Sequence, residues 1–291
     1  DRGCRPSRCR ASTQNYQHSK IKERMRKMLN TPAHQFVFSQ VNAQSPSQIT
    51  VCISLYNYQN YITETLDSVQ QQTQSELDLV VVEDQSPDSS LTVAREWIVR
   101  HADRFNTVHL VQHEQNRGLS AARNTAISIS QTPNLFILDA DNLLYPRCIQ
   151  RCLSALEADP QASVAYPIIE KFGEETGLMG NVVWTRDRFK RQNCIDAMSL
   201  IRKQALLAVD GYSVLSAVGK LGWEDYQLWC KFIDQGFYGV PVPEILARYR
   251  THKASMLNSI SNRRDNIERL HQEMRLQHPW LELPTEAQLT A

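Results

Sequence analysis

The sequence predicts an α/β fold with a mainly parallel central sheet flanked by helices, followed by a smaller, mixed C-terminal region. Between residues 49 and 168, short apolar runs alternate with segments of helical periodicity. The apolar runs are nearly continuous, as expected for strands that are buried on both faces of a parallel sheet. After residue 168 the alternation breaks down, which predicts a different arrangement there.

The composition is that of a globular protein with one large domain or two small ones. Of the 291 residues, 42% are hydrophobic and 22% are charged. The net charge of +1 and the lack of aromatic residues among the N-terminal arginines give no reason to expect a nucleic-acid partner. Because no apolar run approaches the roughly 20 residues that span a bilayer, and no secretory apolar region is recognisable, we expect a cytoplasmic protein.

The cysteines do not predict a disulfide framework. There are seven of them, an odd number without regular spacing. Cys148 and Cys152 are one helical turn apart, but no second pair with zinc-ligand spacing stands nearby. We therefore expect reduced, half-buried cysteines.

Residues 1–48 differ from the rest and are predicted to be a basic, polar extension or linker. Residues 21–29 favour a short basic helix, and residues 32–47 show little periodicity. A basic helix can lie on an anionic membrane, so peripheral membrane contact is the alternative to a solvated linker or a packed helix. Because the chain begins with Asp rather than Met, we expect a processed chain or a piece of a longer protein.

In the first half, predicted strands and helices alternate in order. Strands are expected at residues 49–56, 77–82, 107–112, 134–138 and 162–168, which are apolar and rich in β-branched residues. Helices are expected at residues 61–72, around 93–98, at 118–130 and at 147–158, where apolar residues recur at helical spacing. Ser89 or Ser90 can cap the second helix, and Pro146 suits the start of the last.

In the second half, a glycine-punctuated loop and hairpin are expected at residues 173–184, followed by mixed character at 193–209. The sequence GWEDYQLW at 222–229 predicts a helix that ends near Gly236. Residues 240–249 predict an edge strand, because two prolines interrupt them. A last helix is expected at 262–277, and the final dozen residues predict a loosely packed tail.

Polar side chains follow three of the predicted strands. Asn57 follows the first, Asp84 the second, and Asp139 and Asp141 the fourth. In open parallel sheets, ligands bind beyond these carboxyl ends. A buried carboxylate needs a partner, and paired carboxylates suit Mg²⁺ or Mn²⁺, which often bridge to phosphates. One such pair alone is typical of an ordinary turn, but three polar clusters favour a binding site.

Six segments together resemble family 2 glycosyltransferases of the GT-A fold, over about residues 49–258. In order, they are SLYNYQNYITETLDSVQQQT, VVVEDQSPD, NRGLSAARNTAI, FILDADN, GWEDYQLW and ARYRTH. The resemblance implies an enzyme that transfers a hexosyl unit, with inversion, from a nucleotide-diphosphate sugar to an acceptor hydroxyl. It implies a UDP- or dTDP-sugar as donor, Mn²⁺ or Mg²⁺ as cofactor, and a glycan, lipid-linked or other hydroxyl acceptor.

The resemblance assigns the nucleotide side of the site. Ser54 and Asn57 would lie where the nucleotide binds, and Asp84 would contact the imide N–H of uracil or thymine. Asn116 and Gly118 belong to the segment that approaches the donor. One departure is Glu83, which stands where the family often has Asp.

The resemblance also assigns the diphosphate side. Arg123 would approach the donor, although an isolated arginine there would be a surface charge. Asp139 and Asp141 match the DxD pair, with Asp141 the more direct metal ligand, and Asp139 would also contact the donor. His252 matches a late histidine that closes over metal or diphosphate, whereas alone it would be structural or exposed. Asn142 stands where a third acid is frequent, which softens metal affinity.

An inverting displacement needs one base to take the proton of the acceptor hydroxyl. Asp225 is the predicted base, with Glu224 as the alternative. Acids in the first turn of a helix are also favoured by its dipole alone. Trp223 would either form a wall of the acceptor site or pack in the core.

Two other functions remain as alternatives. A sugar-nucleotide pyrophosphorylase would carry a glycine-rich, basic loop after its first strand, where this chain has Tyr56–Asn57–Tyr58–Gln59. A catalytically inactive nucleotide-sugar-binding domain would lack the DxD or ED acids, and both are present. The identity of the sugar, the acceptor and the oligomeric state are left open by the sequence.

The predicted organisation has three parts. Residues 1–48 form the extension, and residues 49–258 form the GT-A domain. Within that domain, 49–145 is the nucleotide-binding half and 146–258 the acceptor and catalytic half. Residues 259–291 form the C-terminal helix and tail.

Overall fold

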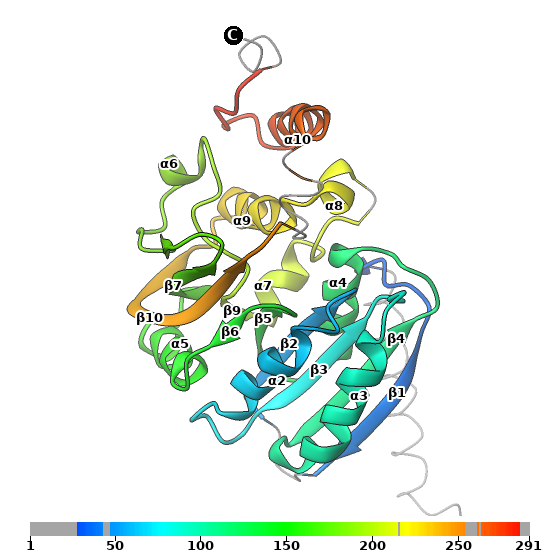
Figure 1. Ribbon diagram of the computed structural model, residues 1–291. Helices are drawn as coiled ribbons and strands as arrows, with labels where there is room; N and C mark the ends of the chain where they lie inside the picture. Colours follow the sequence, from blue (N-terminus) through cyan, green and yellow to red (C-terminus); the bar gives the residue numbers. More distant parts are fainter. Residues whose placement is uncertain (1–27, 43–46, 215, 254–260, 262, 286–291) are drawn as a thin grey trace, which may run out of the picture.

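The computed structural model describes residues 28–42, 47–214, 216–253, 261 and 263–285 (Figure 1). Its first half contains β1 (His34–Val41), β2 (Ile49–Leu55), α2 (Ile62–Gln70), β3 (Asp78–Glu83), α3 (Ser90–His101), the 3₁₀ turn η1 (Ala102–Arg104), β4 (Thr107–His113), α4 (Leu119–Ile129), β5 (Asn134–Asp139) and β6 (Leu143–Leu144). Its second half contains α5 (Cys148–Ala158), β7 (Val164–Gly173), β8 (Gly177–Met179), α6 (Arg186–Phe189), β9 (Leu200–Arg202), α7 (Lys203–Ala208), α8 (Ala217–Leu221), α9 (Glu224–Asp234), β10 (Gly239–Thr251) and α10 (Arg264–Gln277).

One sheet runs through the described chain, in the order β1-β4-β3-β2-β5-β9-β7-β10-β6, and β8 pairs with β7. Strands β4, β3, β2 and β5 are parallel neighbours, which confirms the predicted parallel half. Beyond β5 the pairing becomes mixed, because β9 is antiparallel to both β5 and β7. The predicted α/β fold with a mixed C-terminal region is therefore confirmed.

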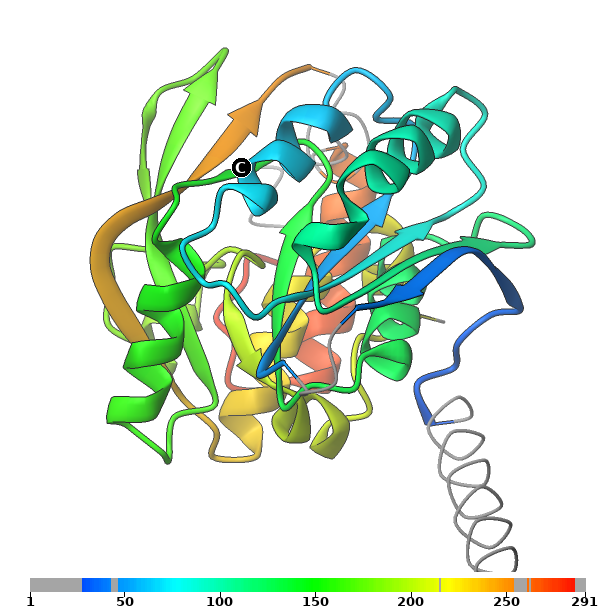
Figure 2. The same cartoon turned by 90° about the horizontal axis from the view of Figure 1, so that it is seen from below.

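Alternate residues of the parallel strands face two separate cores. Ile49, Val51 and Ile53 of β2 pack with α2, α3 and α5 on one face. Cys52 of β2, with residues of β3 and β5, packs with α4, α7, α9 and α10 on the other. Figure 1 shows α2 and α3 in front of the strands and α4 behind them, and Figure 2 shows the same layers from below. Burial on both faces explains why these strands are continuously apolar.

Strand β1 was not predicted and extends the sheet beyond residue 49 toward the N-terminus. It pairs antiparallel with β4, with His34 opposite His113 and Val41 opposite Thr107. Its side chains are half-buried or exposed, and Phe36 is 52% exposed. An edge strand is held by backbone pairing on one side and needs little apolar surface. Its sequence, HQFVFSQV, therefore lacks the continuous apolar run of the central strands.

Three smaller predictions need correction. Ser89 makes no side-chain capping bond at the start of α3. Strand β10 is an edge strand only in part, because β6 pairs with it at Ala247 and Arg248, whereas the segment that carries Pro241 and Pro243 is paired with β7 alone in the described chain. The C-terminal tail is packed where it is described, since Leu281 and Leu283 are buried. The expected hairpin is confirmed by β7 and β8.

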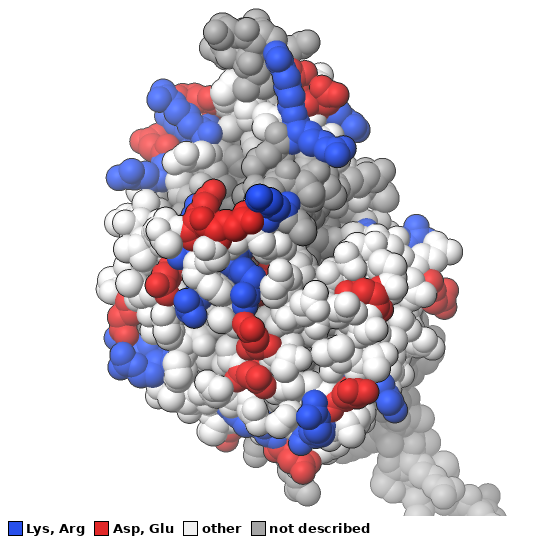
Figure 3. Space-filling view, in the orientation of Figure 1, with Lys and Arg blue, Asp and Glu red and all other residues white. Residues whose placement is uncertain are grey.

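Several predictions lie wholly or partly outside the described residues. These include the basic start, its membrane contact, most of the helix expected at 21–29, and Cys4 and Cys9. Within the described chain the cysteines are unpaired, and no helix is both long and apolar enough to cross a bilayer. On the face drawn in Figure 3, Lys and Arg alternate with Asp and Glu. The division of the domain into two functional halves stays a prediction.

Candidate active site

The predicted nucleotide residues lie at the carboxyl ends of β2 and β5. Ser54 of β2 is in register with Asp139 of β5. Asn57, just after β2, has a φ of 59°, and Gln85, just after β3, has a φ of 58°. The backbone N–H of Asn57 donates to Ser86 Oγ at 3.0 Å, so these two turns support each other. Left-handed turns of this kind are concentrated at functional sites.

A buried arginine joins the two predicted acidic motifs. Arg123 of α4 donates from Nη2 to Asp139 Oδ1 at 2.7 Å and from Nη1 to Glu224 Oε1 at 2.6 Å. The Arg123 guanidinium also lies 5.2 Å from the centre of the Tyr212 ring. These contacts bring the DxD turn and the start of α9 to one shared cation.

This placement changes the predicted role of Arg123. Its side chain is only 2% exposed, and two of its nitrogens contact carboxylates of the protein itself. Burial disfavours its charge, but the charges of Asp139 and Glu224 more than offset this effect and raise the pKa of Arg123 above its ordinary value. Arg123 is therefore a buried ion-pair bridge, and direct contact with the donor stays a prediction.

The second DxD acid, Asp141, is buried against aromatic and basic side chains. His252 Nε2 lies 3.0 Å from Asp141 Oδ2. Burial and the charge of Asp139 raise the pKa of Asp141, whereas the contact with His252 lowers it. The His252 ring packs against Tyr58 and Tyr61, with ring centroids 5.9 and 5.3 Å away. His252 thus lies beside the DxD turn, and its closure over a metal or diphosphate stays a prediction.

Asn142 explains how the end of β10 reaches the DxD turn. Its Oδ1 accepts a hydrogen bond from the backbone N–H of Arg250 at 2.8 Å. Arg250 Nε in turn donates to the backbone carbonyl of Asp141 at 2.9 Å. These bonds fix the chain two residues before His252. Asn142 therefore holds the end of β10 beside the DxD turn, and its effect on metal affinity stays a prediction.

Asp139, Asp141 and His252 stay the predicted ligands of a divalent cation. Across the described residues, no group of three or more His, Cys, Asp or Glu side chains is arranged to hold a metal ion. Arg123 contacts only Oδ1 of Asp139. Two carboxylates and an imidazole, with diphosphate oxygens completing the shell, fit Mn²⁺ or Mg²⁺. The cation would also offset the repulsion between the two acids.

The two acids at the start of α9 lie in different environments. Glu224 is 6% exposed and contacts Arg123. Asp225 is more accessible and accepts a hydrogen bond from Asn193 Nδ2 at 2.8 Å. Burial and the negative charges of Glu224 and Asp196 raise the pKa of Asp225. Because its pKa is raised and its carboxylate is more accessible than that of Glu224, Asp225 is the better candidate for a proton acceptor.

Trp223 directly precedes these two acids and has an uncommon backbone conformation. It has a φ of 70°, a conformation that is uncommon for a bulky residue and costs about 1–3 kcal/mol. Its ring packs 5.8 Å from Tyr226 and 5.2 Å from His271 of α10, centroid to centroid. The core alternative for Trp223 therefore has direct support, and an acceptor contact stays a prediction.

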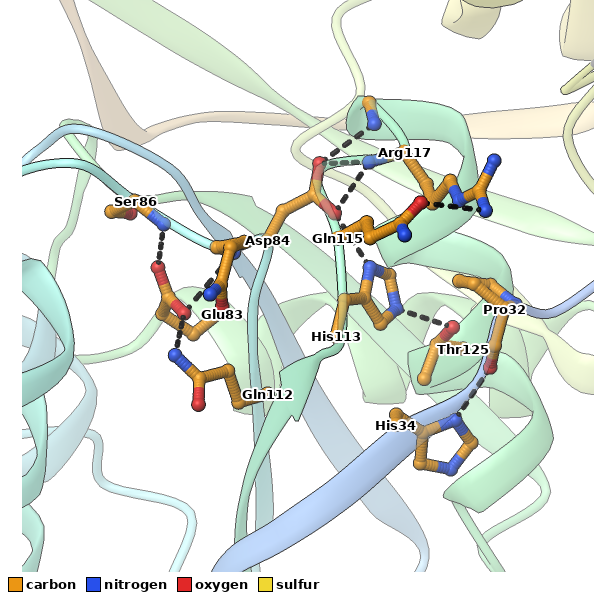
Figure 4. Close-up of polar contacts among 12 residues, drawn as sticks. Pro32, His34, Glu83, Asp84, Ser86, Gln112, His113, Gln115, Arg117 and Thr125 are labelled. Carbon is orange, nitrogen blue, oxygen red and sulfur yellow. Dashed lines mark hydrogen bonds and ion pairs between the residues drawn. The ribbon is translucent and has the colours of Figure 1, made fainter.

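Asp84 is held by the protein, as Figure 4 shows. It is 2% exposed, and its carboxylate accepts from the backbone N–H groups of Arg117 and Gly118, the latter at 2.6 Å. His113 Nδ1 lies 2.6 Å from Asp84 Oδ1. These bonds shape the turn that leads into α4. Contact of Asp84 with a nucleotide base has no support from this geometry and stays a prediction.

The remaining predicted donor residues flank that turn. Gly118 has a φ of 86° and begins α4, a conformation that side chains rarely adopt. Asn116, two residues earlier, is exposed. Glu83, the departure noted above, is fully buried and accepts from the backbone N–H of Ser86 at 2.5 Å. Its longer side chain thus closes the turn after β3.

The structure adds one acid that sequence reasoning missed. Asp196 is 8% exposed and interacts electrostatically with Asp139, Arg123 and Glu224. It lies in the irregular stretch before β9. No strand end, spacing or motif marked it, because its position depends on the pairing of β9 with β5.

The chain is similar in sequence to known glycosyltransferases. The sequence model of the family Glycosyl transferase family 2 matches residues 50–208. Putative glycosyltransferase EpsE of Bacillus subtilis is 23% identical over 71% of this chain and 74% of its own length. Succinoglycan biosynthesis protein ExoU of Rhizobium meliloti is 28% identical over 67% of this chain, which spans 60% of that protein.

Solved structures share the fold. TarS 1-349 of S. aureus in complex with UDP-GlcNAc aligns with a TM-score of 0.65 at 15% identity, over 83% of this chain and 69% of that one. The mannosyltransferase PcManGT of Pyrobaculum calidifontis, in complex with GDP-Man and Mn²⁺, aligns with a TM-score of 0.56 at 19% identity, over 89% and 68%. The fold is thus the GT-A fold, and the chain belongs to the enzymes of glycosyl transferase family 2.

Proposed function

We propose that the chain transfers a hexosyl unit from a nucleotide-diphosphate sugar to an acceptor hydroxyl by a metal-dependent, inverting single displacement. The observation that carries this proposal is the Arg123 bridge, with Asp139 on one side and Glu224 on the other. Through this bridge, the acids suited to binding a leaving diphosphate lie next to the acids suited to proton transfer. An in-line displacement needs both groups on opposite sides of one sugar.

On the leaving-group side, Asp139, Asp141 and His252 would hold Mn²⁺ or Mg²⁺. The metal, when bound, would neutralise the charge that develops on the leaving diphosphate. The chain prepares this side by fixing Asp141 between His252 and the backbone contact of Arg250. Such preorganised groups need little rearrangement during the reaction.

On the acceptor side, Asp225 would take the proton of the attacking hydroxyl. Its carboxylate is steadied by Asn193, and the neighbouring Glu224 is engaged by Arg123. A pKa raised by burial and by adjacent acids brings a carboxylate closer to the ideal range for a general base near neutral pH. No covalent nucleophile is needed for a single displacement.

The donor and acceptor classes are supported by the similar proteins. TarS is described with UDP-GlcNAc and PcManGT with GDP-Man and Mn²⁺, which supports a nucleotide-sugar donor and a divalent metal. We favour a UDP- or dTDP-sugar, bound near Ser54 and Asn57, with Asn116 and Gly118 flanking it. The relative ExoU is described as a succinoglycan biosynthesis protein, which supports a glycan acceptor.

Asp141→Ala is expected to remove the metal dependence of donor binding. In the wild-type protein, Mn²⁺ should strengthen the binding of UDP or of UDP- and dTDP-sugars, as measured by titration calorimetry with Mn²⁺ or with a chelator. The variant should lose at least about tenfold in affinity with Mn²⁺, because even the outer partners of metal ligands contribute that much. With chelator, the two proteins should bind alike.

Asp159→Ala is the control, because Asp159 follows α5 at the opposite end of the sheet and contacts Tyr238 there. It should keep the wild-type response to Mn²⁺. If Mn²⁺ strengthened binding to Asp141→Ala as much as to wild type, Asp141 would not be a ligand. If the folded wild-type protein bound no member of a nucleotide-sugar panel, the proposed function would be wrong.

A further inference from the structure

Strand pairing carries Asp196 to the DxD end of the sheet. Strand β9 is antiparallel to β5, with Ile201 opposite Leu135 and Leu200 opposite Phe136. The pairing continues beyond the strand, since the backbone N–H of Ile137 donates to the carbonyl of Ser199 at 3.2 Å. This bond places Ser199, three residues after Asp196, beside Ile137, two residues before Asp139. Asp139 is the last residue of that strand.

The carboxyl group of Asp196 interacts electrostatically with both acidic motifs. Its charge acts on Asp139 and Glu224, and it also raises the pKa of Asp225. The charge of Arg123 opposes these negative charges. Burial and the charge of Asp139 raise the pKa of Asp196 itself to about 7.

Within the described residues, Asp196 has little bonding of its own. Its Oδ1 accepts the backbone N–H of Met198 at 2.9 Å, which closes a local turn. No ion pair and no hydrogen bond from another side chain reaches this carboxyl group in the described part of the chain. A buried acid without a side-chain partner is costly unless it serves a ligand.

We propose that Asp196 binds a hydroxyl of the transferred sugar and thereby selects the donor. This inference rests on the proposed function, in which the diphosphate lies at Asp139 and Asp141 and the acceptor oxygen at Asp225. The sugar ring must then lie between these two groups during in-line attack. Asp196 is the acid that the fold brings to that same space. A carboxyl group that pairs with one sugar hydroxyl discriminates against a sugar that lacks it, because the acid is then left buried and unpaired.

The test compares Asp196→Ala and Asp196→Asn with wild type on the best nucleotide-sugar donor and on its deoxy analogues, each lacking one ring hydroxyl. Asp196→Ala should raise KM for the full donor roughly 10- to 100-fold, the effect of losing a hydrogen bond to a charged group. Its affinity for the nucleoside diphosphate alone should not change. For one deoxy analogue, wild type and Asp196→Ala should have the same KM, because the hydroxyl that Asp196 binds is already missing.

Asp196→Asn separates binding from folding, because the amide oxygen can still accept the Met198 N–H. Its KM for the donor should lie between those of wild type and Asp196→Ala, because the amide still forms a neutral hydrogen bond. The matched control is Asp159→Asn, whose Oδ1 closes a similar turn by accepting from the backbone N–H of Gln161 at 3.1 Å. This control should behave like wild type with every donor.

Three results would overturn the inference. The first is an equal loss of affinity for nucleoside diphosphate and for nucleotide sugar, which would make Asp196 a support of the diphosphate site. The second is an equal rise in KM for every deoxy donor when Asp196 is replaced by Ala. The third is a fall in kcat with unchanged KM for all donors. In each case the wild-type protein still transfers sugar, so the failure is distinct from a failure of the proposed function, in which wild type binds no donor.

Discussion

Replacing Asp225 with Asn is expected to abolish sugar transfer while metal-dependent donor binding persists. Asn is nearly isosteric and can keep a hydrogen bond with Asn193, but it cannot accept a proton from the acceptor hydroxyl. Loss of a general base lowers kcat by roughly 10²- to 10⁴-fold. Transfer rates with a saturating donor, together with calorimetric donor affinity, measure the two effects separately.

The pH dependence of transfer gives a second readout of Asp225. A base must be deprotonated, and burial with the nearby acids Glu224 and Asp196 raises its pKa. Activity should therefore fall on acidification at a pH above the ordinary carboxylate range of about 4. Glu224→Gln is the comparison, because Glu224 contacts Arg123 and should affect proton transfer less. If Asp225→Asn lost donor affinity as strongly as it lost transfer, Asp225 would be a binding residue.

Arg123→Met is expected to give the largest loss of stability. Arg123 is 2% exposed, and its removal leaves Asp139 and Glu224 close together without their shared cation. Breaking a buried ion pair from one side costs about 3–5 kcal/mol, because a buried charge is left unpaired. Urea unfolding of the variant and of wild type measures this difference in the free energy of unfolding.

Two further variants sharpen the Arg123 test. Arg147→Met removes an exposed arginine that lies 3.5 Å from Glu244 and should cost about 0–1 kcal/mol. Adding Glu224→Gln to Arg123→Met should restore part of the stability, since it neutralises one stranded carboxylate. A loss no larger than that of Arg147→Met, or no recovery in the double variant, would contradict the view that Arg123 holds the two acids together.

The parallel half of the fold could be predicted because its strands are buried on both faces. A run such as Val51, Cys52 and Ile53 has no solvent-facing residue, so its composition alone marks it. Strand β1 could not be predicted in this way, since backbone pairing with β4 holds it and its side chains stay partly in solvent. The partial covering of β10 by β6 could not be predicted either, because β6 is a two-residue strand that leaves no periodic signal.

Most candidate acids of the site could be identified from the sequence, but the side chains and backbone groups that each one contacts could not. Asp84 has a place at a strand end that fits both a ligand and a turn, and its bonds to the backbone of Arg117 and Gly118 are non-local. Arg123 reaches a partner 101 residues away, which no local pattern records. Asp196 stands in no motif and owes its position to strand pairing. Sequence spacing identifies which residues carry charge, whereas tertiary contacts decide which of those charges are already paired.

The central claim is that the DxD acids hold the leaving diphosphate while Asp225, on the other side of the sugar, deprotonates the attacking hydroxyl. Such a single displacement inverts the anomeric carbon. The most direct measurement is proton NMR of the first transfer product, formed with Mn²⁺ from a donor whose sugar is α-linked to the diphosphate. The product is predicted to be β-linked. An α-linked product, or no transfer from a full panel of donors and hydroxyl acceptors, would contradict the claim.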